Sequence, residues 1–596
     1  MSEEPLVSNE ATGEGTPEPG TKRRIGVYIC HCGGNISDYV DVAAVRDALR
    51  EDADVEVAET TMFACADGTQ HEMIDDIRGK HLDGLVVASC SPKLHQVTFR
   101  GVSTRADLNP YAYTQVNIRE QDSWAHTDDR EGATAKAIGL VKAGVAKTRL
   151  STPLKPLRIE TVPATMVVGA GVAGLRAAIA LADIGIAVTV VERAPHVGGW
   201  LGSLGPMFPH DRSGRDQIAE LMAQIEARPT ITVLTNAELV GKTGSFGNYT
   251  AKIRLRTPTT EELRQVEVGT FIIATGADVY APEAGEFGYG IDGVVTIAEF
   301  SARVDEAKGA QLTHHGRPVR SIAYVYCVGN RQAEGNTYCS KFCCTAAVHA
   351  SIKVAHLDPS IRQFHLHRDV RAYGKFELLY NESRERGSLY MRFPDDTPPT
   401  VELMPDKRLA VTLVDALTSS EPLTVPVDLV VLVTGMVPAE NAGLSTLLKL
   451  PLGDDGFYNE IHPKLRPVET VVDGVMIAGA CQGPKTAGEA VSGGLAAVTQ
   501  SAGILLKGFA ELDPLVATVD EAACTGCDAC LASCPYDAIS SYVCDTGTVA
   551  TISAANCKGC GGCVPHCPED AIDLLGYTDA QMRAAIEGLR AKEPVS

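Results

Sequence analysis

Sixteen of the 18 cysteines in the 596-residue chain fall into four groups of four. The two groups nearest the C-terminus both follow the pattern C-x2-C-x2-C-x3-C-P. They consist of Cys524, Cys527, Cys530 and Cys534 with Pro535, and of Cys557, Cys560, Cys563 and Cys567 with Pro568. This run is typical of bacterial two-cluster ferredoxins, whose tight loops wrap around the corners of a cubane iron–sulfur cluster. A structural zinc ribbon is the alternative, but two complete quartets with a proline after each favour iron–sulfur clusters.

The ferredoxin pattern also predicts which cysteines share a cluster. In that fold the fourth cysteine of each run ligates the cluster of the other run. One 4Fe-4S cluster is therefore expected on Cys524, Cys527, Cys530 and Cys567, and a second on Cys557, Cys560, Cys563 and Cys534. The segment from Val519 to Asp573 holds eight carboxylates against one basic residue, Lys558. Solvated surface acidity explains this excess, and so does an acidic electron-transfer surface that meets a basic partner.

The other two cysteine groups have irregular spacing. One consists of Cys327, Cys339, Cys343 and Cys344, at spacing C-x11-C-x3-C-C, and the other of Cys30, Cys32, Cys65 and Cys90. For the first, a cluster and a buried cysteine pair with bystanders are the two interpretations. A redox disulfide is disfavoured there, because adjacent cysteines have poor disulfide geometry. For the second, cluster ligation and ordinary loop cysteines both stay open, and His31 is either a further ligand or a solvent-facing neighbour.

The N-terminal cysteines follow predicted strands of an α/β domain. Arg24 to Cys30 and Leu82 to Cys90 have the composition of buried strands, and Cys65 follows a third apolar stretch. In an open α/β sheet the ends of such strands converge on one edge. Residues 129–149 have helical composition with Lys136, Lys142, Lys147 and Arg149 along them, for which a solvated basic face is the default interpretation.

A dinucleotide-binding motif lies in the middle of the chain. An apolar strand from Thr165 leads into Gly169-x-Gly171-x-x-Gly174 and then into a helix with small residues. The glycines permit a tight turn and a close approach of pyrophosphate to the helix N-terminus. A second strand ends at Glu192, which lies at the distance expected for an acid that hydrogen-bonds the adenosine ribose.

The residues after Glu192 favour FAD over NAD as the dinucleotide. Gly198-Gly199-Trp200 resembles the glycine pair over the pyrophosphate in flavoproteins with two dinucleotide-binding domains, and Thr275-Gly276 resembles their re-entry turn. Gly479, Gln482 and Gly483 lie where the C-terminal flavin strand is expected, before a helix from Ala487 to Ala497. The usual aspartate after this glycine is replaced by Ala480. Lys485 is a candidate for stabilising anionic reduced flavin, with a surface lysine as the alternative.

The second dinucleotide domain lacks its own glycine fingerprint. The strand from Ser321 to Val328 and a later strand from Leu429 to Thr434 are present, but Cys327 and the three cysteines after it stand where the fingerprint is expected. A nicotinamide site is therefore predicted to be lost.

Composition narrows the function classes. The chain is 45% hydrophobic and 21% charged, which is ordinary for globular proteins. Its formal net charge of −22 argues against nucleic acid as a partner. No run is long and apolar enough for a transmembrane span. No secretory signal is recognised, so we expect a cytoplasmic protein, in which thiols favour metal or redox roles over structural disulfides.

Together these motifs resemble the A subunit of heterodisulfide reductase. The resemblance rests on Cys30-His-Cys-Gly-Gly-Asn-Ile, on the segment from Asn117 to His126, on the C-x11-C-x3-C-C group and on Gln482-Gly-Pro-Lys485, and it runs from about residue 24 to 575. It implies a multidomain α/β protein. Its parts would be a thioredoxin-reductase-like FAD fold with two dinucleotide-binding domains, an α/β N-terminal domain and an α+β ferredoxin domain of the bacterial 2x4Fe-4S type.

The domain boundaries follow from these motifs. The expected parts are a disordered acidic tail at 1–23, the cysteine-containing α/β domain at 24–150, a linker at 151–162, the FAD domain at 163–510 with its second subdomain at about 285–435, the ferredoxin domain at 515–575 and a C-terminal helix and tail at 576–596.

The resemblance also implies a function and partners. Family members act in a complex with B and C subunits, where the A subunit is the proposed site of flavin-based electron bifurcation. There, a two-electron donor reduces FAD, one electron goes to ferredoxin and the other to the disulfide-reducing subunits. The family further implies a dimer of heteromers and a separate electron donor, which is a hydrogenase, a formate dehydrogenase or an NADH-oxidising flavoprotein. By the same resemblance Cys327, Cys339, Cys343 and Cys344 bind a cluster beside the flavin, and the N-terminal cysteines contribute another.

One departure from the family limits this transfer. Many archaeal members carry a ferredoxin insertion within the flavin domain, whereas residues 209–270 here contain no cysteine. Two functions therefore remain: a bifurcating oxidoreductase subunit, or an electron-conducting scaffold that joins a dehydrogenase or hydrogenase to other subunits.

Overall fold

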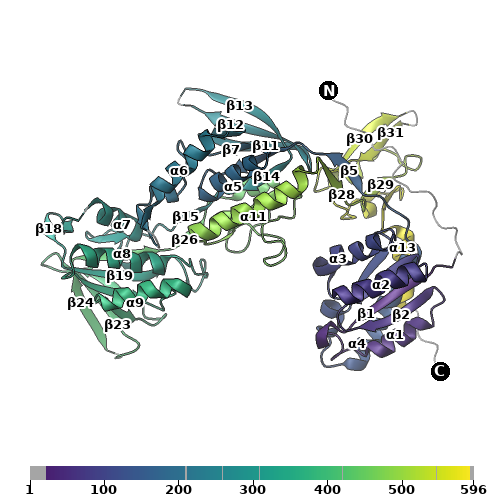
Figure 1. Ribbon diagram of the computed structural model, residues 1–596, viewed down its shortest axis with the longest axis horizontal. Coiled ribbons are helices and arrows are strands. Elements are labelled where there is room, and N and C mark those ends of the chain that lie inside the picture. The colour runs from purple at the N-terminus through teal and green to yellow at the C-terminus, as the bar shows by residue number, and fades with distance from the viewer. Residues whose placement is uncertain are drawn as a thin grey trace. The chain divides into compact units, whose positions relative to one another are not determined.

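Two compact units make up the computed structural model of the chain (Figure 1). Unit 1 comprises Met1–Ile159 with Glu511–Ser596, and unit 2 comprises Glu160–Ala510. The structure describes residues 22–208, 211–257, 259–307, 309–418, 421–544 and 547–590. The tail expected at 1–23 thus lies outside the described residues except for its last two, as do residues 591–596. Among the described helices, none has the length and apolarity needed to cross a membrane.

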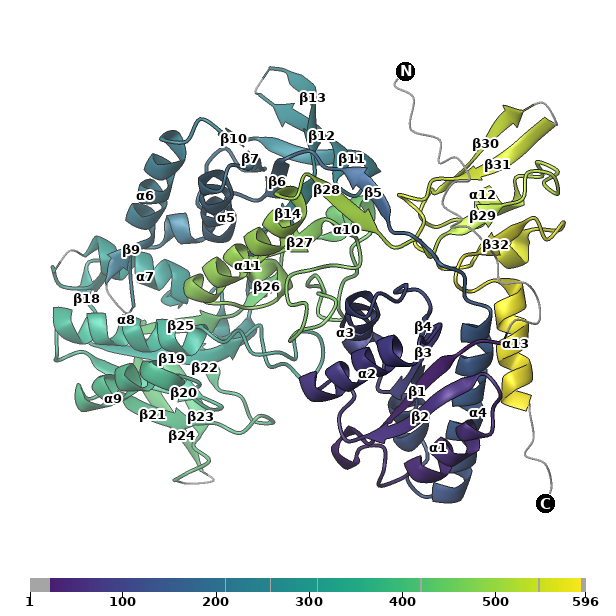
Figure 2. The ribbon, with the colours of Figure 1, turned by 45° about the vertical axis from the view of Figure 1, so that its right-hand side comes forward.

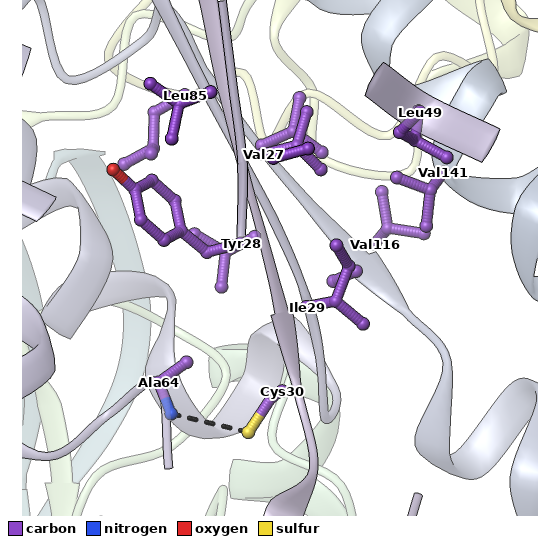
Figure 3. Packing of buried hydrophobic residues seen from close by; sticks show 14 of the residues in the cluster. Val27, Tyr28, Ile29, Cys30, Leu49, Ala64, Leu85, Val116 and Val141 are labelled. Atoms are coloured by element: carbon purple, nitrogen blue, oxygen red, sulfur yellow. Dashed lines mark hydrogen bonds between the residues drawn. The ribbon is translucent and has the colours of Figure 1, made fainter. Parts of the chain in front are cut away.

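Unit 1 begins with a parallel sheet covered by helices (Figure 2). The strands are β1 (Ile25–Cys30), β2 (Val55–Thr61), β3 (Gly84–Ser89) and β4 (Tyr113–Asn117), in the order β2-β1-β3-β4. The helices are α1 (Val42–Arg50), α2 (Asp67–Gly79), α3 (Pro92–Arg105) and α4 (Arg130–Arg149). Every residue of the central strands β1 and β3 is buried, as expected for strands with helices on both faces. Val27 and Ile29 share one buried cluster with Leu49 of α1 and Val141 of α4 (Figure 3).

The basic helix α4 is not a solvated face along its whole length. The C-terminal helix α13 (Asp579–Arg590) packs against it, and Gly588 lies so close that an added Cβ would be 3.0 Å from the Ala143 Cα. The Lys147 ammonium lies 3.4 Å from the centroid of the Tyr577 ring. Burial lowers the pKa of Lys147 to about 8. The interpretation of α4 as a solvated basic face is therefore wrong at Lys147, because a segment distant in sequence covers that lysine.

The C-terminal part of unit 1 is a small repeat of two halves. Its elements are β29 (Ala517–Val519), α12 (Ala529–Ser533), β30 (Ile539–Cys544), β31 (Gly547–Ile552), the 3-10 turn η8 (Val564–His566) and β32 (Ile572–Leu574). β29 pairs antiparallel with β32, and β30 pairs antiparallel with β31. The buried cluster here holds six residues, two of which are Cys530 and Cys563.

Unit 2 contains a first parallel sheet built around the glycine motif. Its strands are β6 (Ala164–Val168), β7 (Ala187–Val191), β10 (Ile231–Leu234), β14 (Thr270–Ile273) and β27 (Val475–Ile477), in the order β10-β7-β6-β14-β27. Its helices are α5 (Val172–Asp183), α6 (Gly214–Glu226) and α11 (Ala487–Leu505). Helix α11 starts where the sequence predicts and runs past Ala497, because Ala497, Val498, Ser501 and Leu505 continue its buried side. A meander of β11 (Ala237–Ser245), β12 (Asn248–Arg256) and β13 (Glu261–Val268) precedes β14.

A second parallel sheet follows in unit 2. Its strands are β16 (Val294–Thr296), β25 (Leu429–Thr434), β19 (Ser321–Val328), β20 (Arg362–His367) and β21 (Leu389–Arg392), in that spatial order. Its helices are α7 (Ile297–Glu306), α8 (Cys343–Leu357) and α9 (Glu377–Glu385), and its meander is β22 (Thr400–Leu403), β23 (Leu409–Val414) and β24 (Pro422–Val427).

Short segments complete both units. β15 (Ala277–Val279) and β26 (Met436–Pro438) pair antiparallel where the chain leaves the first sheet of unit 2 and later returns to it. The remaining elements are β5 (Leu157–Glu160), β8 (Pro206–Met207), β9 (Arg212–Ser213), β17 (Thr313–His314), β18 (Arg317–Pro318), α10 (Ala442–Leu448) and β28 (Phe509–Leu512), with turns η2 (Cys32–Gly34), η3 (Arg119–Ser123), η4 (Leu201–Ser203), η5 (Glu286–Gly288), η6 (Gly374–Phe376) and η7 (Gly479–Gln482).

Candidate functional site

Two cavities in the C-terminal repeat are each lined by four cysteines. The first is lined by Cys524, Cys527, Cys530 and Cys567. The second is lined by Cys534, Cys557, Cys560 and Cys563. Each cavity thus draws three cysteines from one run and the fourth from the other. This is the sharing that the ferredoxin pattern predicts.

Backbone amides point at the cysteine sulfurs of both cavities. Ala538 N–H donates to Cys534 Sγ at 3.4 Å, and Ala571 N–H donates to Cys567 Sγ at 3.2 Å, each four residues after its cysteine. Ala550 N–H of β31 donates to Cys524 Sγ at 3.4 Å, and Ala517 N–H of β29 donates to Cys557 Sγ at 3.5 Å. Such donors stabilise thiolates, and hydrogen bonds to the sulfurs are one way a protein sets a cluster's potential.

The spacing of the sulfurs fits a polynuclear cluster better than a single ion. Around one zinc ion, with Zn–S bonds of about 2.3 Å, tetrahedral ligand sulfurs lie about 3.8 Å apart. Among the described residues, no three cysteine sulfurs lie within 4.8 Å of one another. The zinc ribbon is therefore disfavoured on geometry, and the donor sets fit four-iron cubes.

The glycine motif forms a cradle at the end of β6. Gly169 has φ +108°, and a Cβ there would lie 2.3 Å from the Ala274 carbonyl oxygen of the neighbouring chain segment. A Cβ on Gly174 would lie 2.0 Å from the Gly169 carbonyl oxygen, so this glycine permits α5 to pack close to its strand. Gly171 differs, because its φ of −76° suits any residue and nothing lies within 4 Å of an added Cβ. The open space at Gly171, at the N-terminus of α5, is the space that a pyrophosphate would fill.

The other predicted flavin residues surround this cradle. Glu192, directly after β7, accepts hydrogen bonds from Ala170 N–H at 2.8 Å and Ala194 N–H at 2.9 Å, so its carboxylate lies at the glycine turn. Gly198 N–H donates to the Ala170 carbonyl at 2.8 Å, and Gly198 and Gly199 have φ of +108° and +53°. The glycine pair therefore crosses the motif, as the sequence predicts for a flavoprotein.

The two later flavin segments also reach this edge of the sheet. The Thr275 hydroxyl follows β14, is buried and has no hydrogen-bond partner among the described residues, and Gly276 after it has φ +76°. Gly479, at the end of β27, has φ +78°, and Gly483 has φ +142°. A buried hydroxyl without a partner, beside an open glycine turn, fits a polar ligand at this place.

Lys485 lies on the loop between β27 and α11. Its ammonium donates to the Gln482 side-chain oxygen at 2.6 Å, and the Gln482 amide donates to the Pro467 carbonyl at 2.8 Å. Burial lowers the pKa of Lys485, while Cys481, Glu460 and Glu489 act in the opposite direction. Lys485 is thus a partly buried cation held by Gln482, and not the fully exposed surface lysine of the alternative interpretation.

The Cys327 group gathers at the carboxyl end of β19. A bulge between Val325 and Val328 and a φ of +63° at Cys327 turn this thiol out of the strand's regular alternation. Cys343 and Cys344 are the first two residues of α8, and both are buried. Burial raises the pKa of Cys327 to about 11, with the thiols of Cys344 and Cys339 adding to this effect. The four thiols therefore lie close enough together for their charges to affect one another.

Three arginines surround this group, and the sequence analysis did not identify them. Arg331 lies 4.0 Å from the Cys327 sulfur and is fixed by Asp369 at 2.9 Å. Arg368 lowers the pKa of Cys327, and Asp369 together with the Cys339 thiol raises the pKa of Arg371. The signal in the sequence was the Arg368-Asp-Val-Arg371 run directly after β20, which pairs with β19, the strand that contains Cys327. Three guanidinium groups would offset much of the negative charge that four thiolates carry.

The Cys327 group is tied to the flavin cradle within unit 2. The Trp200 indole, directly after the glycine pair, packs edge-on against the Phe342 ring with centroids 5.3 Å apart. The Lys341 ammonium pairs with the Glu489 carboxylate at the start of α11. Residues 339–344 are therefore held from two sides by the segments that the sequence assigns to FAD.

A side chain covers the turn after β19, where the second glycine fingerprint is expected. Gly329 follows β19, with φ +72°, and a Cβ on it would lie 2.0 Å from the ring of Tyr280. The Tyr280 hydroxyl donates to Glu286 at 2.9 Å, which fixes the ring there. The Tyr280 ring therefore packs directly against this turn, and the loss of a nicotinamide site stays a prediction.

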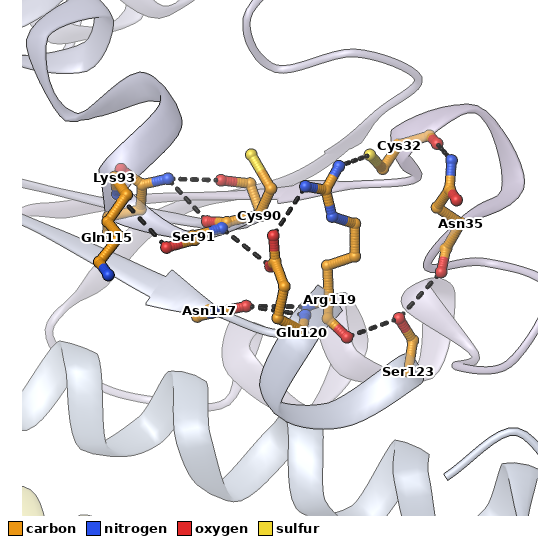
Figure 4. Close-up of polar contacts among 11 residues, drawn as sticks. Cys32, Asn35, Cys90, Ser91, Lys93, Gln115, Asn117, Arg119, Glu120 and Ser123 are labelled. Atoms are coloured by element: carbon orange, nitrogen blue, oxygen red, sulfur yellow. Dashed lines mark hydrogen bonds and ion pairs between the residues drawn. The ribbon is translucent and has the colours of Figure 1, made fainter. Parts of the chain in front are cut away.

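The N-terminal cysteines meet at the carboxyl edge of the first sheet of unit 1. Cys30 ends β1, Cys32 begins η2, and Cys65 and Cys90 follow β2 and β3. Cys30 Sγ accepts hydrogen bonds from Cys32 N–H at 3.2 Å and from Ala64 N–H at 3.3 Å (Figure 3). Burial raises the pKa of Cys30, and the thiols of Cys32 and Cys65 add to it. The four thiols again form one group, now with Arg119 beside Cys32 and Cys90 (Figure 4).

Comparisons with known proteins agree with this geometry. Residues 163–323 match the pyridine nucleotide-disulphide oxidoreductase family, and residues 517–581 match the 4Fe-4S dicluster domain family. The second iron-sulfur A subunit of the CoB–CoM heterodisulfide reductase of Methanopyrus kandleri is 33% identical over 87% of this chain and 91% of its own length. The chain belongs to the family of heterodisulfide reductase A subunits.

Other heterodisulfide reductase A subunits match over a similar span. The A subunit of the H(2):CoB-CoM heterodisulfide,ferredoxin reductase of Methanothermobacter marburgensis is 34% identical over 87% of this chain and 90% of its own length. The A subunit of the ferredoxin/F(420)H(2)-dependent CoB-CoM heterodisulfide reductase of Methanosarcina acetivorans is 32% identical over 87% of this chain and 75% of its own length. Among solved structures, a thioredoxin reductase of T. acidophilum covers 57% of this chain and 97% of its own, with 15% identity and a TM-score of 0.39. The chain is therefore an oxidoreductase subunit with the flavin and iron–sulfur domains of its family.

Proposed function

We propose that the chain is the FAD and iron–sulfur electron-transfer subunit of a heterodisulfide-reductase-like complex in the cytoplasm, and that it performs flavin-based electron bifurcation. FAD exchanges electrons in pairs or singly, and each 4Fe-4S cluster exchanges one. The donor is a hydrogenase, a formate dehydrogenase or an NADH-oxidising flavoprotein. The acceptors are ferredoxin and a disulfide-reducing partner, reached through B and C subunits in a dimer of heteromers.

The observation that carries this proposal is the pair of contacts between the flavin cradle and the Cys327 group. Trp200 and Glu489, which flank the proposed flavin site, hold Phe342 and Lys341 of the cysteine segment. A one-electron acceptor held next to FAD is what separates an electron pair into single electrons. In this proposal Gly169, Gly171, Gly174 and Glu192 bind the adenosine and pyrophosphate end, and Thr275, Gly276 and the Gly479 loop bind the other end.

Lys485 and the arginines around Cys327 have proposed roles near these contacts. Lys485, held by Gln482, provides a fixed cation for the reduced, anionic flavin, which is a way to stabilise charge without rearrangement. The arginines around Cys327 offset the charge of that group and keep its thiolates available for iron.

The names of relatives support a family in which the donor varies. They specify H(2), H(2) or formate, and ferredoxin with F(420)H(2). Each name also includes the CoB–CoM heterodisulfide, so we propose a disulfide of this kind or an analogous one as the second acceptor here.

A second candidate function is an electron-conducting scaffold. It is favoured by the segment that contains no cysteine between residues 209 and 270, where the structure has β10 and the β11–β13 meander. Bifurcation requires two separate exits for electrons, and many archaeal members have an additional ferredoxin insertion here.

One experiment separates the two functions. The complex is purified anaerobically with its own partners and given its electron donor with ferredoxin alone, with the disulfide alone, or with both. Bifurcation predicts that ferredoxin is reduced only when the disulfide is present. A scaffold predicts that either acceptor is reduced independently, which would overturn the bifurcation proposal. Cys339→Ser should abolish the coupled reduction, while Cys544→Ser, a cysteine outside the four groups, should leave it intact.

A further inference from the structure

An arginine lies among the N-terminal cysteines, and neither the flavin site nor the ferredoxin region uses it. Arg119 is the first residue of η3, which follows β4 at the same carboxyl edge of the sheet as Cys30, Cys32, Cys65 and Cys90. Only 15% of its side chain is exposed. Its Nη1–H donates to Cys32 Sγ at 3.3 Å (Figure 4). An N–H to sulfur contact from a charged side chain is stronger than one from a neutral donor.

The guanidinium is held in this position by two neighbours, Glu120 and Trp124. Its Nη2–H donates to Glu120 Oε1 at 2.7 Å, and Glu120 Oε2 accepts from Ser91 N–H at 2.9 Å (Figure 4). Ser91 directly follows Cys90, so the same carboxylate fixes both the arginine and the Cys90 loop. On the other side, the guanidinium carbon lies 4.6 Å from the centroid of the Trp124 ring. A side chain fixed this way loses little further freedom when it binds a ligand.

A buried donor of Arg119 has no partner in the part of the chain that the structure describes. Its Nε–H is buried and has no hydrogen-bond partner among the described residues. A buried charged donor without an acceptor is costly, and native sites with one usually bind a further group. The sulfide corners of an iron–sulfur cluster held by the adjacent cysteines are acceptors of the required kind.

The charge of Arg119 acts on the thiols themselves. Its guanidinium lies within hydrogen-bond distance of Cys32 Sγ, at 3.3 Å, and so places a fixed positive charge at the cysteine group. A nearby fixed cation favours any state of the site with more negative charge, and a reduced cluster carries one more negative charge than an oxidised one. Hydrogen bonds to the sulfurs act in the same direction.

We infer that Arg119 sets the reduction potential of a cluster on the N-terminal cysteines and holds it at a higher value than the cysteines alone would give. Glu120 acts in the opposite direction, since it neutralises part of the same charge while it fixes the guanidinium. This inference rests on the proposed N-terminal cluster. It assigns to Arg119 the role of a residue that adjusts a potential, and to Glu120 that of a positioning residue.

The test is a redox titration of the full chain, loaded anaerobically and followed by electron paramagnetic resonance. The N-terminal cluster is identified as the signal lost in the Cys32→Ser/Cys90→Ser variant. In Arg119→Met, the ratio of reduced to oxidised N-terminal cluster at a fixed applied potential should fall at least about tenfold. This corresponds to a reduction potential lower by about 59 mV for one electron. Arg119→Lys should shift it less, Glu120→Gln should shift it the other way, and Arg130→Met, at an exposed position of α4, should not shift it.

The outcomes separate this inference from the proposed function. If the double cysteine variant loses no iron, the N-terminal cysteines hold no cluster and the expectation of a cluster there is wrong, while the proposed function at the flavin and the Cys327 group is untouched. If the cluster is present and both Arg119→Met and Glu120→Gln titrate like the unmodified chain, the inference about Arg119 is wrong. If Arg119→Met fails to retain iron, Arg119→Lys and Glu120→Gln decide, and unchanged potentials in both overturn it.

Discussion

The three glycines of the motif show that one residue type can be required for different physical reasons. At Gly174 an added Cβ would meet the Gly169 carbonyl oxygen at 2.0 Å, so the fold itself excludes alanine. At Gly171 nothing lies within 4 Å, and the backbone is one that alanine adopts freely. Gly171 is therefore explained by a ligand and Gly174 by packing.

This difference gives a matched pair of variants. Gly171→Ala should leave the thermal stability of the protein without FAD unchanged but weaken FAD binding, because the methyl group occupies the pyrophosphate space. Gly174→Ala should destabilise the same protein by about 1–3 kcal/mol through overpacking. The measurements are thermal unfolding without FAD and a fluorescence titration with FAD. Equal effects of both variants on stability would contradict the assignment of the cradle.

The sharing of ferredoxin cysteines can also be tested with pairs of residues. Cys527 and Cys567 line one cavity, whereas Cys560 lines the other. The Cys527→Ser/Cys567→Ser variant should therefore lose about four Fe and keep one ferredoxin cluster unchanged. The Cys560→Ser/Cys567→Ser variant should perturb both clusters. Iron analysis and electron paramagnetic resonance measure this, and the opposite pattern would show that each run binds its own cluster.

At the scale of single residues, the sequence reveals the residues that bind cofactors better than the residues that surround and position them. The cysteines and motif glycines are recognisable because their spacing is fixed by the group they bind. Arg368 and Arg371 show no local relation to Cys327, since β20 brings them from a separate part of the chain. Tyr280 over Gly329 is a contact of the same kind, which no local pattern contains.

At the scale of elements, parallel sheets explain why distant cysteines meet. Cys30, Cys65 and Cys90 follow β1, β2 and β3, and these strands are neighbours in one sheet. Apolar strand patterns were sufficient to predict this edge. They were not sufficient to predict that α13 covers part of α4, because the contact of Gly588 with Ala143 depends on the path of the whole chain.

The C-terminal repeat depends on its metal more than the other elements do. Its buried cluster consists of Ala517, Cys530, Ala550, Cys563, Ile572 and Leu574, which is a small core for about sixty residues. Removing iron with a chelator should therefore unfold residues 515–575, because metal binding supplies folding free energy. Hydrogen exchange should rise in this segment and stay low in β6 and β14 of unit 2. Unchanged protection of the repeat without iron would contradict this account.

At the scale of the whole molecule, the predicted loss of a nicotinamide site would determine which donors can act directly. The Tyr280 ring and the Cys327 group stand at the carboxyl end of β19, where the second glycine fingerprint is expected. The isolated chain with FAD should therefore stay oxidised in NADH, as seen in its flavin absorbance, while dithionite reduces it. Bleaching by NADH without partner proteins would show that a nicotinamide site is present.

The central claim is that four cysteine groups and one flavin cradle all hold redox groups. Iron and flavin analysis of protein purified without oxygen tests it most directly. The account predicts about 16 Fe and one FAD per chain, with four Fe for each cysteine group. A value of about eight Fe would contradict it, because only the two cavities of the C-terminal repeat would then hold clusters.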